Sequence, residues 1–187
     1  MILLLAAVIG LAIGLLSGGS LKNMRSYPLK GLLLPILAWL LKAGAAYILQ
    51  PQQGAVLVCL LQYGLLFAFL ALNIRRPVWP IFVSLGTLSN FFVILLNGGR
   101  MPVSASLIGS LPQRLEQLKM NQIYAYCLAD GRTILPFLGD ILRVGPEGTP
   151  LGFASVGDLF LCVGVLILCI HLTRSSQRKE PTSTKQE

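Results

Sequence analysis

The chain has 187 residues, of which 55% are hydrophobic and only 12% are charged, whereas about a quarter of the residues of an ordinary soluble domain are charged. This composition argues against a water-soluble globular protein. The net charge of +8 is typical of nucleic-acid binding or of membrane topology, and the mean hydropathy of +0.74 favours the membrane, so we expect a lipid bilayer as partner and no nucleic acid.

Five apolar stretches predict membrane spans, since a helix needs about 20 mostly apolar residues to cross a bilayer. The stretches cover residues 1–16, 32–49, 55–72, 78–96 and 156–172. We therefore predict an all-α fold, an integral membrane bundle of five transmembrane helices over residues 1–173. The polar remainder, residues 174–187, is predicted to be a disordered cytoplasmic tail.

The first span is short enough to be compared with a signal peptide. It lacks a basic beginning, and the Ser-Gly-Gly that follows is not a clear cleavage site, so we interpret it as a span. Small residues recur in it every four positions: Ala6, Gly10, Gly14 and Gly18. Such a face is typical of close helix packing in membranes. The alternative is that glycine and alanine are simply common in membrane helices.

The basic residues predict the orientation, because Lys and Arg in short connections favour the cytoplasmic side. They gather in three segments: Lys22, Arg25 and Lys30 after the first span, Arg75 and Arg76 after the third, and Arg174, Arg178, Lys179 and Lys185 in the tail. With five crossings, this places the N-terminus and the loop 98–155 outside and the C-terminus in the cytoplasm.

The outer loop, residues 98–155, is predicted to be partly structured. Ser110 with Gln113 three residues later indicates a helix start, and the pattern that follows predicts an amphipathic helix reaching about Tyr126. This helix is expected to lie in the outer headgroup plane. The apolar run Leu135–Leu138 is expected to dip back into the interface.

The cysteines and the single histidine predict no metal site. Cys59, Cys162 and Cys169 lie within spans, Cys127 has no local partner, and His171 lies at the cytoplasmic edge. Phosphate-binding glycine loops and the GxSxG and HExxH motifs do not occur in the sequence. We expect no cofactor.

The candidate site residues are polar groups at the outer ends of the spans. Asn90 and Asn97 share a face of the fourth span, Arg100 follows it, and Lys42 lies within the second span. We assign these four as candidate substrate-binding residues. Charges inside spans are expensive, so Lys42 is the most conspicuous; it is expected to snorkel outward or to pair with Asp158.

Two aspartates are the candidate catalytic residues. A re-entrant turn would bring Asp140 close to Asp158, and two carboxylates sharing a proton can act as general base and acid on a water that attacks a peptide bond. The alternative, which we favour, is that Asp158 is the N-cap of the last span and Asp140 is an exposed loop acid beside Arg143.

Three motifs resemble an uncharacterised family of small bacterial membrane proteins, a domain of unknown function. They are Asn-Gly-Gly-Arg-Met-Pro at residues 97–102, Leu-Pro-Phe-Leu-Gly-Asp at 135–140, and Ser-x-Gly-Asp at 155–158. The resemblance covers most of the chain and implies a multi-pass protein of the bacterial plasma membrane, without naming a reaction.

A local resemblance links the end of the chain to signal peptidase II, the aspartic enzyme that trims bacterial prolipoproteins. Residues 138–142 and 154–158 are similar in order and spacing to the stretches that hold that family's aspartates. The resemblance implies that Asp140 and Asp158 form the catalytic pair. A serine stands where that family has an asparagine, two of its asparagine motifs are not evident, and this chain has an extra span.

Two functions follow from these residues. We favour a non-enzymatic membrane module, a transport, lipid-binding or assembly subunit. The alternative is a membrane-embedded hydrolase or peptidase that uses Asp140 and Asp158. The partners expected besides the bilayer are a membrane peptide, a lipid or a partner membrane subunit.

Overall fold

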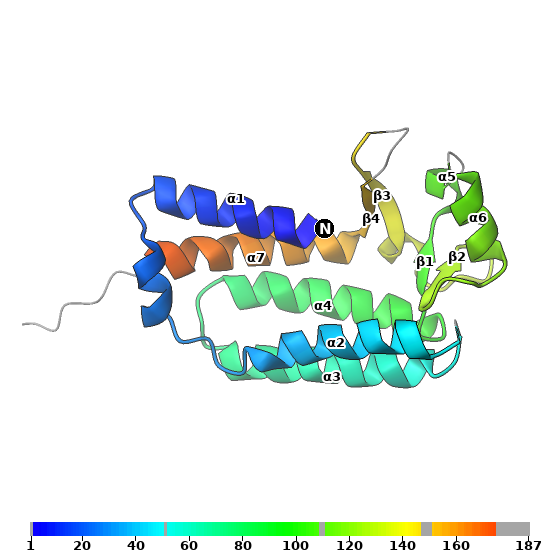
Figure 1. Cartoon of the computed structure of the whole chain (residues 1–187), viewed down its shortest axis with the longest axis horizontal. Helices are drawn as coiled ribbons and strands as arrows, with labels where there is room; N and C mark the ends of the chain where they lie inside the picture. Colours follow the sequence, from blue (N-terminus) through cyan, green and yellow to red (C-terminus); the bar gives the residue numbers. More distant parts are fainter. Residues whose placement is uncertain (1, 51, 109–110, 147–150, 175–187) are drawn as a thin grey trace, which may run out of the picture.

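The computed structural model describes residues 2–50, 52–108, 111–146 and 151–174 (Figure 1). It is mostly helical, and each of the five apolar stretches forms a helix. In chain order the long helices of the described residues are α1 (Ile2–Leu16), α2 (Leu33–Ile48), α3 (Ala55–Asn73), α4 (Trp79–Leu96) and α7 (Val156–Arg174). Prolines occur only in first turns, at Pro35 of α2 and Pro80 of α4, where a missing N–H costs no helical hydrogen bond.

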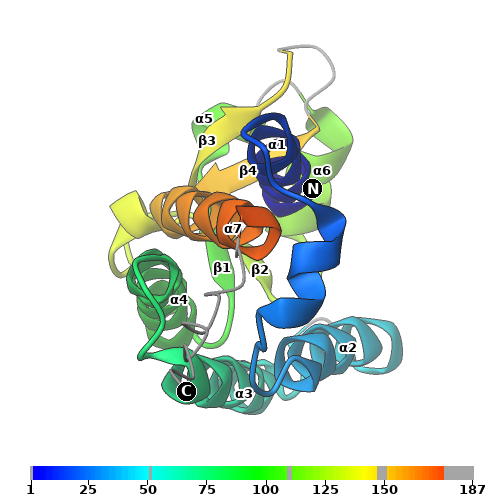
Figure 2. The same cartoon turned by 90° about the vertical axis from the view of Figure 1, so that its left-hand side faces the viewer.

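The long helices form a curved row (Figure 2). Helix α7 packs between α1 and α4, α3 packs on α4, and α2 packs on α3. The first and last helices of the chain are thus neighbours. The connection from α1 to α2, which contains the 3₁₀ helix η1 (Leu21–Ser26), runs across the row at the end opposite the strands (Figure 1).

Small residues allow the helices in this row to touch. A Cβ atom at Gly10 would lie 2.7 Å from the backbone oxygen of Leu166 in α7, and one at Gly14 would lie 1.9 Å from Thr173 Oγ1. The predicted packing face of α1 is confirmed at Ala6, Gly10 and Gly14, which are buried. It does not extend to Gly18, which lies beyond the helix and where an added Cβ atom would meet no atom within 4 Å.

Three of the described helices are long and apolar enough to cross a membrane: α3, α4 and α7, with 19, 18 and 19 residues. The apolar helices α1 and α2 have 15 and 16 residues, which at 1.5 Å per residue give about 22–24 Å against a hydrocarbon core of roughly 30 Å. The fold is compatible with a membrane protein, and a count of five transmembrane helices is not confirmed.

Residues 101–155, which we name the head, contain a small sheet that the all-α prediction lacks. Its strands are β1 (Met101–Val103), β2 (Tyr126–Leu128), β3 (Asp140–Val144) and β4 (Gly152–Ser155), in the order β2-β1-β3-β4. β1 pairs in parallel with β2 and β3, and β3 pairs antiparallel with β4. Strands of three to five residues are too short to show an alternating pattern.

The head also contains two helices, α5 (Ala105–Ile108) and α6 (Pro112–Lys119). The prediction of one helix from Ser110 to about Tyr126 is wrong at its end, and Ser110 lies outside the described residues. Asn121 takes a left-handed conformation with φ 51°, and the N–H of Gln122 donates to the carbonyl of Gln117 at 2.8 Å. This is a Schellman ending, after which Tyr126 belongs to β2.

The apolar run before β3 docks the head onto the bundle, and its dipping back into the membrane interface stays a prediction. It forms the 3₁₀ helix η2 (Pro136–Leu138). Leu135 and Leu138 pack against a buried cluster of α3, α4 and β1 that includes Tyr63 and Val93. The predicted tail, apart from Arg174, lies outside the described residues.

Candidate functional site

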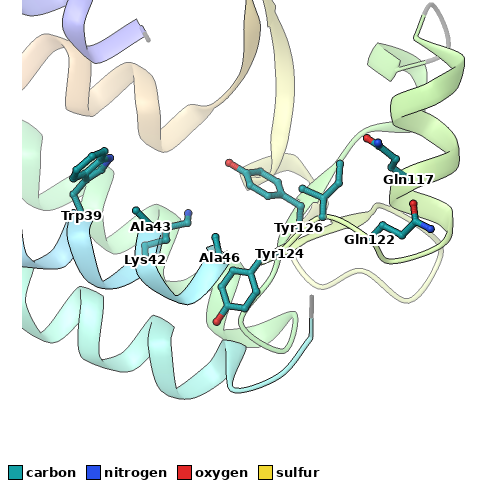
Figure 3. Close-up of a pocket in the computed structure, with 9 residues that line it drawn as sticks. Trp39, Lys42, Ala43, Ala46, Gln117, Gln122, Tyr124 and Tyr126 are labelled. Carbon is teal, nitrogen blue, oxygen red and sulfur yellow. The ribbon is translucent and has the colours of Figure 1, made fainter. Parts of the chain in front are cut away.

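Two adjoining cavities lie where the head meets the end of α2, and Figure 3 shows residues that line the first. They have volumes of about 450 and 500 Å³ and share Gln117, Ile123 and Tyr126. We name them together the Tyr126 cleft. Lys42 and Trp39 of α2 line the first cavity. The second is lined by residues of the head: α6, β1, β2, β3 and β4 contribute to its walls.

Tyr126 stands between the cavities because β2 holds its backbone beside Met101 of β1. The side chains of Tyr126 and Lys42 point toward one another (Figure 3), and Lys42 Nζ lies 5.5 Å from the centre of the ring, within the range of a cation–π contact. Burial, followed by the negative charges of Asp140 and Asp158, raises the pKa of Tyr126 to about 12. The phenol is therefore neutral at pH 7 and available as a hydrogen-bond donor.

The expectation that Asp140 is an exposed loop acid is wrong, because Asp140 lines the second cavity and is only 6% exposed. It begins β3 directly before a bulge, since Asp140 pairs with Ser155 and Leu142 with Ala154, which leaves Ile141 between them. Bulges re-aim the side chains beside them. Burial raises the pKa of Asp140 to about 7, the charge of Asp158 adds to the effect, and Lys42 opposes it.

Asp158 belongs to a hydrogen-bonded network at the start of α7. Its backbone N–H donates to Ser155 Oγ at 3.0 Å, and its Oδ2 accepts the N–H of Ser155 at 3.0 Å. This is a capping box, in which Ser155 is the N-cap and Asp158 reaches back to it. Asn90 of α4 completes the network, donating to Asp158 Oδ1 at 3.0 Å and accepting from Ser155 Oγ at 2.8 Å.

The other two predicted site residues lie elsewhere. Asn97 holds the loop before η2, because its Nδ2 donates to the carbonyl of Ile134 at 2.8 Å and its Oδ1 accepts the N–H of Ile134 at 3.0 Å. Arg100 donates to Asn121 Oδ1 at 3.2 Å. Both line a third cavity. Of the predicted residues, the structure therefore brings only Lys42 and Asp140 to the Tyr126 cleft.

Sequence reasoning missed Tyr126, Gln117 and Arg114, which line the Tyr126 cleft. Tyr126 carried no signal because β2 has three residues and was expected to be helical. Gln117 and Arg114 belong to α6, within the predicted amphipathic helix, but the other walls of the cleft come from segments distant in the sequence.

The cleft combines two chemical capacities. Lys42 and Arg114 are cations that attract an anionic group, and Asp140 can take up or release a proton near pH 7. No group of three His, Cys, Asp or Glu side chains suited to a metal ion occurs in the part of the chain that the structure describes. The four cysteines are free.

The comparisons with known proteins place the chain in a family without assigning an activity. No curated protein and no solved structure matches it. The resemblance of residues 138–142 and 154–158 to signal peptidase II stays a prediction. The model of one family matches residues 20–170, most of the chain, and the protein belongs to this family, the Family of unknown function (DUF5317).

Proposed function

We propose that this protein is an integral membrane protein that binds an amphipathic molecule with an anionic headgroup in the Tyr126 cleft. The molecule is a lipid of the outer leaflet or a lipid-anchored ligand. In this proposal the protein is a binding module, and Asp158 has a structural role as part of the capping box at α7.

The observation that carries the proposal is that Lys42 is partly buried and makes no direct ion pair with a described residue. Its side chain is half-buried beside Tyr126 at the mouth of the first cavity. Within the described residues it makes no ion pair within 4.0 Å. An ammonium withdrawn from water with no carboxylate in direct contact is costly. An anionic headgroup in the cleft would supply such a contact.

The shape of the first cavity supports an amphipathic ligand. The lining extends along α2 on both sides of Lys42, with Ala43 and Ala46 toward the head and Trp39 on the side away from it (Figure 3). Trp39 is 67% exposed and lies near the middle of α2, where it would face the acyl chains of the lipid if α2 crosses the membrane. An apolar tail would follow α2 while the headgroup contacts Lys42 and Gln117.

The proposal includes a topology in the bacterial plasma membrane. All five long helices cross it, and the short helices α1 and α2 are accommodated by local thinning of the bilayer. The basic connections lie at the end of the bundle opposite the head (Figure 1), and this end faces the cytoplasm. The N-terminus and the head lie outside.

Fluorescence quenching tests the binding proposal. Trp79 is fully buried, so Trp39 is the tryptophan that a brominated lipid can reach. We expect brominated phosphatidylglycerol to quench Trp39 more strongly than brominated phosphatidylcholine at equal mole fraction, and Lys42→Met to remove the difference. Lys22→Met, at the opposite end, is the matched control, and Trp39→Phe gives the background. Equal quenching by the two lipids in the unmodified protein contradicts the proposal.

A second candidate is the aspartic hydrolase. The observation that favours it is Asp140, a buried carboxyl with a pKa of about 7 that faces the cleft and is influenced by Asp158. If the pair is catalytic, Asp140→Asn and Asp158→Asn each give a folded protein that fails to complement a deletion strain. Two well-expressed variants that complement fully exclude it.

A further inference from the structure

A third cavity, of about 630 Å³, lies on the other side of β2 from the Tyr126 cleft. Tyr126 and Cys127 are consecutive in the strand, so their side chains point to opposite faces. Cys127 lines this third cavity, and Leu118 is the one residue that it shares with the Tyr126 cleft among the lining residues described. The two sites are therefore separate in space and in composition.

Basic side chains from three separate segments converge on this cavity. Arg100 comes from the connection between α4 and β1, Lys119 from the last turn of α6, and Arg132 from the loop after β2. The one acid among the described lining residues is Asp130, whose Oδ1 accepts the N–H of Arg132 at 2.9 Å and the hydroxyl of Thr133 at 3.2 Å. Positive charge is therefore in excess.

Arg100 is positioned before any ligand arrives. The glycine before it packs so closely on α3 that a Cβ there would lie 2.4 Å from the carbonyl carbon of Ala55. The half-buried Arg100 guanidinium donates to Asn121 Oδ1 at 3.2 Å, and Asn121 is itself fixed in the Schellman ending of α6. A guanidinium held in this way retains further N–H donors for an oxyanion.

The loop that carries Arg132 is anchored as well. Asn97 binds both backbone groups of Ile134, two residues after Arg132. Within the loop, the Asp130 carboxylate closes the turn at Arg132 by accepting the N–H of Arg132. The sequence motif that begins at Asn97 thus ties the end of α4 to this loop, and the arginine of the motif lines the same cavity as Arg132.

We infer that this cavity is a phosphate-binding site, in which Arg100 and Arg132 contact the phosphate oxygens and Lys119 adds charge from the rim. Paired guanidinium groups match the geometry and charge of phosphate. The phosphate belongs to a phospholipid headgroup or to a soluble phosphoester, since the cavity adjoins Leu96 at the end of α4. The site does not depend on ligand binding in the Tyr126 cleft.

The free thiol of Cys127 provides a local readout. The full-length protein in phosphate-free detergent is alkylated with N-ethylmaleimide, and modification of Cys127 is followed by peptide mass spectrometry. At about ten times its Kd, a bound probe is expected to slow alkylation by about tenfold, because only the free site reacts. Glycerol 3-phosphate is the soluble probe, and phosphatidylglycerol in mixed micelles is the lipid probe. Protection by glycerol 3-phosphate assigns a soluble phosphoester, and protection by the lipid alone assigns a headgroup.

Variants decide whether the protection arises at this site. Arg100→Gln and Arg132→Gln are expected to abolish it, whereas Arg100→Lys retains part of it, and Arg75→Gln at the opposite end leaves it unchanged. Circular dichroism confirms that each variant keeps its helical content. Three results would overturn the inference. The first is that sodium chloride at matched ionic strength protects Cys127 as well as the probes do, and the second is that neither probe protects it. The third is that protection is unchanged in the Arg100→Gln variant. Quenching of Trp39 reports separately on the Tyr126 cleft.

Discussion

Asp140 is the residue whose charge state most depends on the fold. Its side chain is enclosed by the head and faces a cavity rather than a paired cation. Among the described residues its carboxylate has no hydrogen-bond partner, while the carboxylate of Asp158 has two. The two aspartates that the sequence presents as equivalent candidates therefore differ in role: Asp158 stabilises a helix start, and Asp140 can exchange a proton with the cleft.

We predict that stability depends on pH through Asp140. Its pKa is about 7 in the folded protein against 3.8 for an ordinary carboxyl, so between these values the folded state holds the proton more tightly. The contribution of Asp140 to the free energy of unfolding is largest below pH 4. It falls by an amount on the order of 4 kcal/mol as the pH rises toward 7. The Tm should be higher at pH 5.5 than at pH 8, and Asp140→Asn should reduce that difference.

The matched control for this prediction is Asp130→Asn. The Asp130 carboxyl is fully exposed in the loop after β2, and hydrogen bonds from Arg132 and Thr133 lower its pKa. Replacing it leaves the difference in Tm between pH 5.5 and pH 8 in place. If Asp140→Asn keeps the full difference as well, the pH dependence arises at another group.

The capping box shows what residue spacing alone can predict. A serine three residues before an acid at the start of an apolar run is a known sequence signature, and Ser155 with Asp158 fits it. The sequence interpretation assigned the N-cap to Asp158, one of the two residues involved. The hydrogen bonds from Asn90 were outside its reach, because they require α4 and α7 to lie side by side.

Close packing through glycine distinguishes the helix contacts of this fold. A Cβ atom added at Gly10 would lie 2.7 Å from the carbonyl oxygen of Leu166 on α7. A Cβ atom added at Gly64 in α3 would meet no atom within 4 Å. The same substitution should therefore have opposite effects at the two positions. The four-residue spacing on α1 predicted the first of these contacts but not its partner helix.

We predict that Gly10→Ala destabilises the protein by about 1–3 kcal/mol, because backbone atoms of α7 must move to admit the methyl group. Gly64→Ala, the matched control, should leave stability unchanged or raise it by up to about 1 kcal/mol, since alanine favours the helix. Thermal unfolding of both variants in the same detergent measures the difference. Similar Tm values for the two variants contradict the packing of α1 on α7.

The head marks the limit of prediction at the level of elements. The five apolar stretches all form helices, as predicted, because a long apolar run is by itself a clear sequence signal for a helix. The strands β1 and β2 are separated by more than 20 residues and pair in parallel, so no turn motif predicts their pairing. Each has only three residues, too few for an alternating pattern. Both cavities of the Tyr126 cleft are lined by such segments, and for this reason their composition could not be predicted.

The charge of the whole molecule is distributed along the long axis of the bundle. Basic side chains occupy the connections at the end opposite the head; Arg76, for example, stacks on Tyr27 at 4.8 Å and donates to the carbonyl of Pro28. The head has acids and bases in similar numbers. This asymmetry, predicted from the sequence, persists in the fold, because η1 and the connection from α3 to α4 lie at the same end (Figure 1).

We predict that a membrane-impermeant maleimide labels Ser106→Cys in intact cells and Lys22→Cys only after the membrane is permeabilised. Both positions are exposed, one in the head and the other in η1, and both variants carry Cys127→Ser to remove the thiol of the head. Labelling of Lys22→Cys but not of Ser106→Cys in intact cells reverses the orientation, and labelling of both in intact cells shows that α2 does not cross. An epitope tag at the N-terminus then counts the spans. If α1 and α2 cross the membrane, the tag and Lys22→Cys are accessible from opposite sides. If only α3, α4 and α7 cross, the tag, Lys22→Cys and Ser106→Cys are all accessible from the same side, because α3 and α4 alone separate the first two from the head.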